Sequence, residues 1–238
     1  MNLLVDIGNS NCKIAITKDY TIVEEFHSST NLLKKIKNLF SEYKITHSCL
    51  SNVSTPNIEL IELLKNNSYF FDLKNNNYLP FKNPYKKGLV GDDRLALICA
   101  VKKDYPDQNI LIIDIGTCIT YDIMTENNNY VAGGISPGIK LRFDSINQGT
   151  FLIKKIKPNY PKDLKAYDTE SSVNIGTLIG VQLEIEGFIK KYSSQYANLK
   201  VIITGGDSIY LSGIIKNTIF TSSNYVFKGL EYLIETNK

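Results

Sequence analysis

The sequence contains one strand–turn–strand pattern twice, and this internal repeat constrains the fold more than any other feature. The first copy reads LLVDIGNS over 3–10 and continues into alternating residues at 12–16. The second copy reads LIIDIGTC over 111–118 and continues into a second strand at 119–123. A buried strand followed by an Asp-x-Gly turn is common on its own. Two copies separated by nearly half of the 238 residues indicate a duplicated domain.

The segments after each copy follow a similar order of strands and helices. Apolar periodicity and turn residues predict strands at 21–27, 45–53, 69–73, 130–135 and 200–204, and helices at 32–40, 55–64, 92–104, 137–145, 171–191 and 230–236. The stretch 74–90 is rich in Asn, Lys and Pro and is expected to form a long loop. This pattern predicts an α/β protein with two similar lobes, 1–106 and 107–238, and a cleft between them.

Composition excludes several other classes of protein. With 43% hydrophobic and 21% charged residues, the chain can bury a core and is not typical of disordered or fibrous proteins. The net charge of +3 comes from scattered lysines, which argues against a nucleic-acid partner. No apolar stretch approaches the roughly 20 residues of a membrane helix, so no membrane association is expected.

The cysteines and the first residues indicate the cellular compartment. The four cysteines, Cys12, Cys49, Cys99 and Cys118, form no C-x-x-C pair, and no histidine is spaced to join them. Reduced thiols are therefore expected in place of disulfides or a metal site. The start of the chain lacks the basic region of a signal peptide. These features favour a cytoplasmic protein.

The two Asp-x-Gly turns are candidate phosphate-binding elements. Glycine lets backbone N–H groups approach an anion, and the neighbouring carboxylate can hold magnesium or its waters. The alternative is two ordinary hairpins whose aspartates cap their own turns. Lys13 could reach a phosphate or could be a solvated strand lysine. The run TGGD at 204–207 could pack against a ring or sugar, or could be a plain strand-to-helix turn.

Only two of the 27 basic residues are arginines, Arg94 and Arg142. Arg94 ends the run GDDR at 91–94, where a planar guanidinium could hold a carboxylate or phosphate at two points. Asp93 could then act as a base toward a hydroxyl. The alternative is that Asp92 and Asp93 only cap the following helix. Arg142 is expected to form a structural or interface salt bridge.

Five motifs in this order resemble those of the type III pantothenate kinases. They are DIGNS at 6–10, GDDR at 91–94, DIGT at 114–117, GGISPG at 133–138 and TGGD at 204–207. The resemblance runs from Met1 to about Asp207. The family belongs to the superfamily of acetate and sugar kinases, heat-shock chaperones and actin. The resemblance implies two ribonuclease H-like (actin-like ATPase) lobes, each a mixed sheet flanked by helices, and a homodimer.

The resemblance also implies an activity. It is the ATP-dependent phosphorylation of the primary hydroxyl of pantothenate to 4'-phosphopantothenate, the first step of coenzyme A biosynthesis. The reaction would need Mg²⁺ and a monovalent cation, K⁺ or NH₄⁺. Two alternatives stay open: a kinase of the same superfamily that acts on another small substrate, and a nucleotide-binding regulatory protein without kinase activity. No helix-turn-helix or basic stripe supports the regulatory alternative.

Matching of motifs implies a role for individual residues. Asp93 would be the catalytic proton acceptor, Asp114 would bind the monovalent cation, and Thr117 would contact ATP. The first ATP-binding loop would comprise Asp6, Ile7, Gly8, Asn9, Ser10, Asn11, Cys12 and Lys13. The pantothenate-binding residues would be Tyr85, Gly91, Asp92, Asp93, Arg94 and Thr169, with Tyr78 as a rival to Tyr85.

The sequence departs from the family pattern at a few positions. Ser10 stands where threonine is usual and keeps the hydroxyl. Cys118 and Ile119 follow Thr117, where small or hydroxyl residues are typical. Ser172 and Val173 replace the usual Ala-Ile, which is a conservative change.

Overall fold

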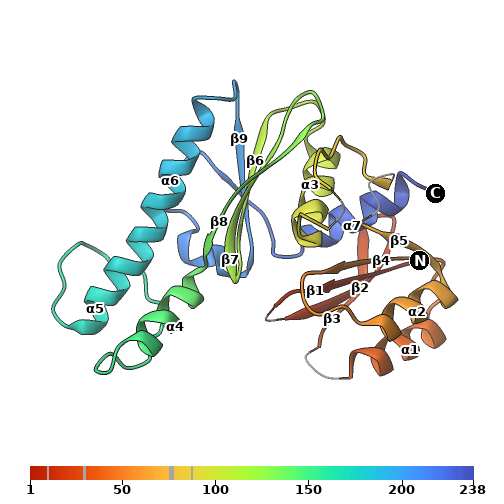
Figure 1. Cartoon of the computed structure of the whole chain (residues 1–238), viewed down its shortest axis with the longest axis horizontal. Coiled ribbons are helices and arrows are strands. Elements are labelled where there is room, and N and C mark those ends of the chain that lie inside the picture. Colours follow the sequence, from red (N-terminus) through yellow and green to blue (C-terminus); the bar gives the residue numbers. More distant parts are fainter. Residues whose placement is uncertain (10, 29–30, 75–77, 87) are drawn as a thin grey trace. The chain divides into compact units, whose positions relative to one another are not determined.

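The computed structural model describes residues 1–9, 11–28, 31–74, 78–86 and 88–238 (Figure 1). The chain forms two compact units. The first unit comprises Met1–Asp107, Asn127–Val131 and Asn224–Lys238, and the second comprises Gln108–Glu126 and Ala132–Ser223. The segments 127–131 and 224–238 are thus grouped with the first unit, although the sequence analysis places them in the second lobe. The lobe boundary at 106 and 107 stays a prediction.

The first unit is built on a five-stranded sheet of mixed direction. Its strands are β1 (Asn2–Ile7), β2 (Cys12–Lys18), β3 (Thr21–Ser28), β4 (His47–Asn52) and β5 (Tyr69–Asp72). Their order is β3-β2-β1-β4-β5. The central strand β1 runs antiparallel to β2 and parallel to β4, so the ends of β1 and β4 lie at the same edge of the sheet.

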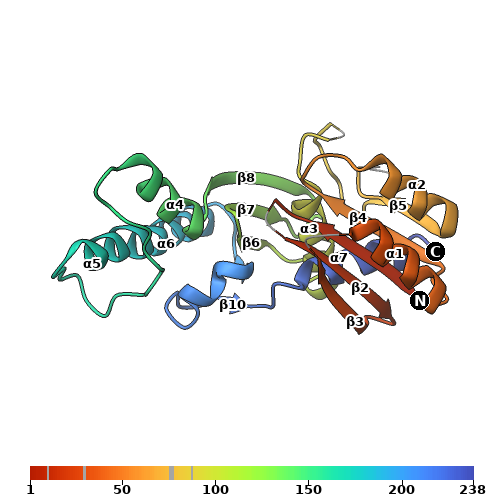
Figure 2. The same cartoon turned by 90° about the horizontal axis from the view of Figure 1, so that it is seen from below.

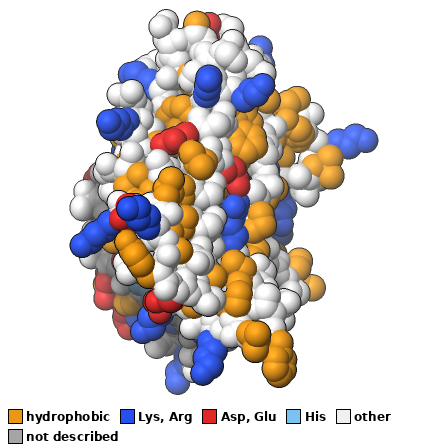
Figure 3. Space-filling model, turned by 90° about the vertical axis from the view of Figure 1, so that its left-hand side faces the viewer, with side chains coloured by type: hydrophobic (Ala, Val, Ile, Leu, Met, Phe, Trp, Pro, Cys, Tyr) orange, Lys and Arg blue, Asp and Glu red, His pale blue; other side chains and the backbone are white. Residues whose placement is uncertain are grey.

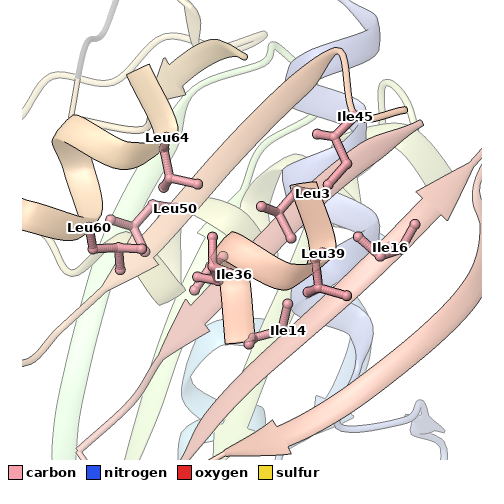
Figure 4. Close-up of a cluster of buried hydrophobic side chains, with 10 residues drawn as sticks. Leu3, Ile14, Ile16, Ile36, Leu39, Ile45, Leu50, Leu60 and Leu64 are labelled. Atoms are coloured by element: carbon pink, nitrogen blue, oxygen red, sulfur yellow. The ribbon is translucent and has the colours of Figure 1, made fainter. Parts of the chain in front are cut away.

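Two amphipathic helices, α1 (Leu32–Glu42) and α2 (Ile58–Asn67), cover one face of this sheet. Because side chains alternate along a strand, Leu3 and Val5 point to these helices. Figure 4 shows the resulting core, in which apolar residues of α1 and α2 meet those of the strands. The cluster consists of Leu3, Val5, Ile14, Ile16, Ile36, Leu39, Ile45, Leu50, Leu60 and Leu64.

The opposite face of the sheet is covered by α3 (Asp92–Asp104) and α7 (Tyr225–Glu235). These two helices approach each other closely at Gly229, where a Cβ atom would lie 1.7 Å from the carbonyl oxygen of Ala96. Only glycine fits at that crossing. Helix α3 is buried along its length from Leu95 to Val101, which explains why its sequence is apolar on all sides.

The second sheet repeats the order of the first. It contains β6 (Ile110–Ile115), β7 (Cys118–Met124), β8 (Tyr130–Pro137), β9 (Lys200–Thr204) and β10 (Ile219–Phe220). Their order is β10-β9-β6-β7-β8, with β6 antiparallel to β7 and parallel to β9. The two sheets confirm the predicted α/β class and the duplication.

The helices of the second unit are α4 (Ile139–Gly149), α5 (Thr169–Asn174) and α6 (Gly180–Ser193), and a 3₁₀ helix, η3, covers Gly206–Leu211. Figure 2 shows α4 and α5 beyond one end of the sheet. A π-helical turn, η2 (Ile175–Ile179), joins α5 to α6. The single helix predicted over 171–191 therefore contains a widened turn, with Gly176 inside it and Gly180 directly after it.

Helices α2 and α7 begin elsewhere than predicted, and strand β10 is not among the predicted strands. Helix α2 starts at Ile58 because the Asn57 side chain caps it, accepting a hydrogen bond from Leu60 N at 3.0 Å. Helix α7 starts at Tyr225, earlier than expected, and its first turn is buried. Strand β10 has only two residues, which is too short to produce an alternating pattern.

Candidate active site

Asp6 lies near the carboxyl end of β1, between residues of two neighbouring strands. Lys13 of β2 and Ser51 of β4 are its register partners. Ser51 Oγ donates a hydrogen bond to Asp6 Oδ1 at 2.8 Å. The pKa of the Asp6 carboxyl is raised to about 6, chiefly by burial and also by the charges of Asp93 and Asp92, while Ser51 and Lys13 oppose the shift. A cation beside Asp6 would lower this pKa.

The turn after Asp6 is closed by its own backbone. Gly8 N donates to Asn11 O at 2.9 Å, and Ile7 O accepts from Val53 N at 3.0 Å. Asn9 and Asn11 are exposed, so the turn is fixed at its base and open at its tip. Ser10, which the sequence analysis includes in this loop, lies outside the described residues.

Two residues of β2 border this turn. Burial raises the pKa of the Cys12 thiol to about 11, and the charge of Asp6 adds to the shift, so this thiol stays protonated at neutral pH. Lys13 Nζ donates to Asn224 Oδ1 at 3.3 Å, and Asn224 Nδ2 donates to Glu25 Oε2 at 2.6 Å. Lys13 is thus half-buried and held at the start of α7 instead of extending into solvent.

The run 91–94 forms the start of α3. Gly91 is the N-cap residue. Asp93 Oδ1 accepts a hydrogen bond from Arg94 N at 2.7 Å, which folds the carboxylate back over the helix start. A Cβ atom on Gly91 would lie 2.5 Å from the same oxygen. The glycine of this motif therefore leaves room for the Asp93 carboxylate.

The other two side chains of the motif are buried. Arg94 is 8% exposed and Asp92 is 3% exposed. Asp92 Oδ2 accepts from Asn52 N at 3.0 Å and lies 3.6 Å from Lys74 Nζ. The carboxylate of Asp92 therefore faces the end of β4 and does not cap its own helix.

The two candidate tyrosines occupy different parts of the first unit. The Tyr85 ring packs edge-on against Tyr130, with centroids 5.6 Å apart, and Tyr85 N donates to Asn83 Oδ1 at 3.1 Å. The Tyr78 ring packs edge-on against Phe71 of β5, with centroids 5.3 Å apart. Each of the two rings is thus held by one aromatic neighbour, Tyr130 for Tyr85 and Phe71 for Tyr78.

In the second unit, three of the sequence motifs meet around Asp114. Thr204 of β9 is the register partner of Asp114 on β6. The next residue, Gly205, has a φ of 99°, and a Cβ atom there would lie 2.4 Å from Asp114 Oδ1. A residue other than glycine would therefore be strained and would also displace the carboxylate.

The third motif supports the turn that follows Asp114. Gly138 N donates to Thr117 O at 3.0 Å. A Cβ atom on Gly138 would lie 2.1 Å from Gly116 O and 2.6 Å from Thr117 O. Glycine at 138 thus allows the start of α4 to sit against the turn, and the Thr117 side chain remains exposed.

The donors present fit magnesium and a monovalent cation. Asp6 and Asp114 each supply a carboxylate beside a tight turn. Within the described ranges, no group of three or more His, Cys, Asp or Glu side chains gathers to hold a metal. Mg²⁺ commonly takes only one or two protein carboxylates and completes its shell with phosphate and water. The fit therefore depends on a bound polyphosphate.

Thr169 lies in an open groove of about 820 Å³ in the second unit. The groove is lined by Arg142, Ser145, Ile146, Ile153, Asp168, Thr169, Ser172, Val173, Gly176 and Thr177. Figure 3 shows hydrophobic side chains gathered on the face that includes α4, α5 and α6. Phe151 and Leu152, which follow α4, are almost fully exposed. Such an apolar surface is typical of an interface between proteins.

Arg142 has the structural role that the sequence predicts. Its guanidinium pairs with Glu184 Oε2 at 2.5 Å and donates from Nε to Pro137 O at 2.8 Å. Tyr121 Oη also donates to Glu184, at 2.9 Å. The arginine thus joins α4 to α6.

Sequence reasoning missed several residues around the first turn. Ser51, Asn52, Lys74 and Asn224 hold Asp6, Asp92 or Lys13 by hydrogen bonds or ion pairs. The only sequence signal for Ser51 and Asn52 is their place at the end of a buried strand parallel to β1. Asn224 is distant in sequence and carries no such signal.

Among the described residues, no helix is long and apolar enough to cross a bilayer. Comparisons with known proteins agree with the motifs. A family model described as type III pantothenate kinase matches residues 2–191. A type III pantothenate kinase of Christiangramia forsetii is 38% identical, over 100% of this chain and 99% of that protein. One of Flavobacterium psychrophilum is 35% identical over 100% of both chains.

Solved structures show the same fold. A Campylobacter jejuni structure described as a Baf family transcriptional activator superposes with a TM-score of 0.67 and 26% identity, covering 99% of this chain and 98% of that one. A ROK hexokinase from Thermus thermophilus superposes with a TM-score of 0.52 at 8% identity, covering 99% of both chains. The second likeness concerns the fold alone and supports two ribonuclease H-like lobes.

Proposed function

The chain belongs to the type III pantothenate kinase family, and from this premise we propose how its residues perform the reaction. The activity is the ATP-dependent phosphorylation of pantothenate in coenzyme A biosynthesis. The observation that carries the assignment is the match over the whole chain to named pantothenate kinases. The grouping of the family's motifs around Asp6 and around Asp114 supports it.

We infer that Asp93 is the proton acceptor. Its carboxylate is held over the start of α3 by Arg94 N, with room provided by Gly91. Phosphoryl transfer depends mostly on positioning and on neutralising charge, and the hydroxyl proton leaves late. Asp93 accepts a hydrogen bond from the primary hydroxyl of pantothenate and then takes its proton. An ordinary carboxylate is basic enough for that role.

The loop of residues 6–13 holds the phosphates of ATP in this proposal. Backbone N–H groups of the turn would bind phosphate oxygens, and Lys13 supplies a positive charge from the neighbouring strand. Asp6 would hold Mg²⁺ or its waters, and Asp114 would hold K⁺ or NH₄⁺ beside Thr117, which would contact ATP. When bound, these cations neutralise the charge of the polyphosphate. The raised pKa of Asp6 supports a cation at that position.

Pantothenate carries a carboxylate that a guanidinium can bind at two points. Arg94 provides that contact, and Gly91 and Tyr85 line the same pocket in this proposal. The motif also predicts Asp92 in this pocket, but its buried carboxylate binds Asn52 N at the end of β4, so we do not include Asp92 among the substrate contacts. Thr169, which lines the groove of the second unit, is a further proposed pantothenate-binding residue. The lobe division at 106 and 107 remains part of the proposal.

We also propose that the protein is a cytoplasmic homodimer. The open groove at Thr169 and the exposed Phe151 and Leu152 support a second copy of the chain at this face. The four cysteines are free thiols, as is usual in a reducing compartment. Light scattering of the purified protein tests the dimer, and a monomer at micromolar concentration would contradict it.

A coupled assay of ADP release, with and without pantothenate, tests the activity. The expected result is turnover that requires pantothenate and increases with K⁺ or NH₄⁺. A panel of other small hydroxyl acceptors separates this function from that of another kinase of the superfamily. Turnover that is absent or independent of pantothenate would favour one of the alternatives, a different acceptor or a regulatory nucleotide-binding protein.

A further inference from the structure

Asp92 stands beside the proposed base but is enclosed by protein. The residue is 3% exposed, and its Oδ1 atom is buried without a hydrogen-bond partner among the described residues. Its other carboxylate oxygen faces the end of β4. The burial of Asp92 therefore argues for a role within the protein and not in the pantothenate pocket.

The contacts of Asp92 join the start of α3 to the end of β4. Asp92 Oδ2 accepts a hydrogen bond from Asn52 N at 3.0 Å. Asn52 is the register partner of Ile7, the residue that leads into the ATP-binding turn. Val53 N, the next donor along the chain, bonds to Ile7 O at 3.0 Å. A single carboxylate thus links the helix that carries Asp93 to the strand pair that carries Asp6.

A second contact of Asp92 reaches the segment after β5. Lys74 Nζ lies 3.6 Å from Asp92 Oδ2, and Lys74 N donates to Asp72 Oδ1 at 2.9 Å. The ion pair fastens the beginning of the 74–90 segment to the start of α3. The Lys74 side chain is 39% exposed, so this contact is the weaker of the two.

Helix capping does not explain this arrangement. Gly91, the N-cap residue of α3, makes no side-chain cap hydrogen bond, and the first-turn amide of Arg94 is bonded by Asp93 and not by Asp92. Asp92 Oδ2 instead accepts a hydrogen bond from the backbone amide of Asn52, at the end of β4. A buried charge-assisted hydrogen bond of this kind fixes geometry as well as contributing stability.

We propose that Asp92 is a positioning residue. By accepting a hydrogen bond from Asn52 N, it fixes the start of α3 and so holds the Asp93 carboxylate at a set position relative to the turn after Asp6. The inference rests on the proposed function of Asp93. What matters for this role is an acceptor oxygen at the position of Asp92 Oδ2, and the negative charge is secondary.

Two conservative variants separate position from charge. Asp92→Asn keeps an acceptor oxygen near the Asn52 amide and loses the charge. Asp92→Glu keeps the charge but moves the carboxylate by one methylene. A displacement of about 1 Å near a reacting group can cost on the order of 100-fold in rate. We expect kcat of Asp92→Asn to stay within about threefold of wild type, and kcat of Asp92→Glu to fall roughly 10- to 100-fold.

Both variants should keep KM for ATP and for pantothenate within about threefold of wild type, because neither changes a substrate contact. Asp104→Asn is the matched control, since it makes the same change at the other end of α3, where Asp104 pairs with Lys228 at 2.7 Å. Its kcat should equal that of wild type. The reverse result would overturn the proposal: Asp92→Glu would keep wild-type kcat, and Asp92→Asn would show a lower kcat or a higher KM for pantothenate. That result would mean that the negative charge of Asp92 makes the contact that matters.

Hydrogen exchange of the Asn52 amide tests the link without reference to activity. The amide should be protected in wild type and in Asp92→Asn, and it should exchange at least about tenfold faster in Asp92→Glu. Equal protection in all three proteins would overturn the link. Failure of the proposed function has a different signature, which is a wild-type protein that does not turn over pantothenate while the exchange pattern holds.

Discussion

Gly91→Ala should reduce catalysis while leaving the fold intact. Gly91 has φ −61° and ψ 143°, which alanine adopts without strain. The added Cβ would lie 2.5 Å from Asp93 Oδ1 and 3.3 Å from Val53 Cγ1. Because the carboxylate is the flexible end of a side chain, it can retreat at little cost in stability. The substitution therefore acts mainly on the position of Asp93.

The size of the effect follows from the clash. Real Cβ atoms essentially never come within 3.0 Å of another heavy atom, so the carboxylate must move by roughly 0.5 Å or more. A shift of that size at the proposed base should lower kcat about 10- to 100-fold, or about 1.4 to 2.7 kcal/mol in the barrier. Replacing glycine restricts the unfolded chain, but alanine is a poorer N-cap. The free energy of unfolding should therefore stay within about 1 kcal/mol of wild type.

The assay combines steady-state ADP release with urea unfolding of the same preparations. Gly187→Ala is the matched control, since Gly187 lies inside α6 and no heavy atom would come within 4 Å of its Cβ. The control should gain roughly 0.5 to 1 kcal/mol in stability and keep its kcat. A Gly91→Ala protein with wild-type kcat would refute the placement of Asp93 as the base.

Three further predictions concern stability, pH and assembly. Gly229→Ala should lower the free energy of unfolding by about 3 kcal/mol, because the added Cβ would lie 1.7 Å from the Ala96 carbonyl oxygen. Urea unfolding measures this change, and an unchanged midpoint would contradict the packing of α3 on α7. Burial raises the pKa of Asp92 from 3.8 to about 6, so the folded state binds a proton more tightly than the unfolded state. The contribution of the protonated Asp92 carboxyl to stability is complete below about pH 4 and is lost as the pH rises through about 6. Between these pH values, the free energy of unfolding of wild type should fall more than that of Asp92→Asn, by on the order of 1 to 3 kcal/mol. Parallel pH profiles of the two proteins would contradict the shift. Phe151→Asp should shift the protein toward the monomer in light scattering, whereas an unchanged mass would argue against an interface at that exposed residue.

Much of the fold could be predicted from the sequence because local sequence patterns determine where many of its strands, helices and turns form. The duplicated hairpins, the buried helix α3 and strand β9 follow from runs of apolar residues and from turn glycines. The failures have local causes too. The Asn57 cap decided the start of α2, and β10 was too short to leave a pattern.

The candidate site was less accessible to sequence reasoning. The motif residues themselves stand out as glycines and aspartates, but their supports do not. Asn52 acts through its backbone amide, which no side-chain pattern reveals. Asn224 binds Lys13 across a long stretch of sequence. The motif predicts Asp92 as a pocket residue, and only the hydrogen bond from Asn52 N shows that its carboxylate faces the end of β4.

The central claim is that this chain phosphorylates pantothenate with Asp93 as the base. The most direct test follows the formation of 4'-phosphopantothenate by ³¹P NMR in wild type and Asp93→Asn, with ATP binding measured by calorimetry. Wild type should form the product, and Asp93→Asn should bind ATP with similar affinity and lose turnover by at least about 1,000-fold. Near-wild-type product formation by Asp93→Asn would contradict the account.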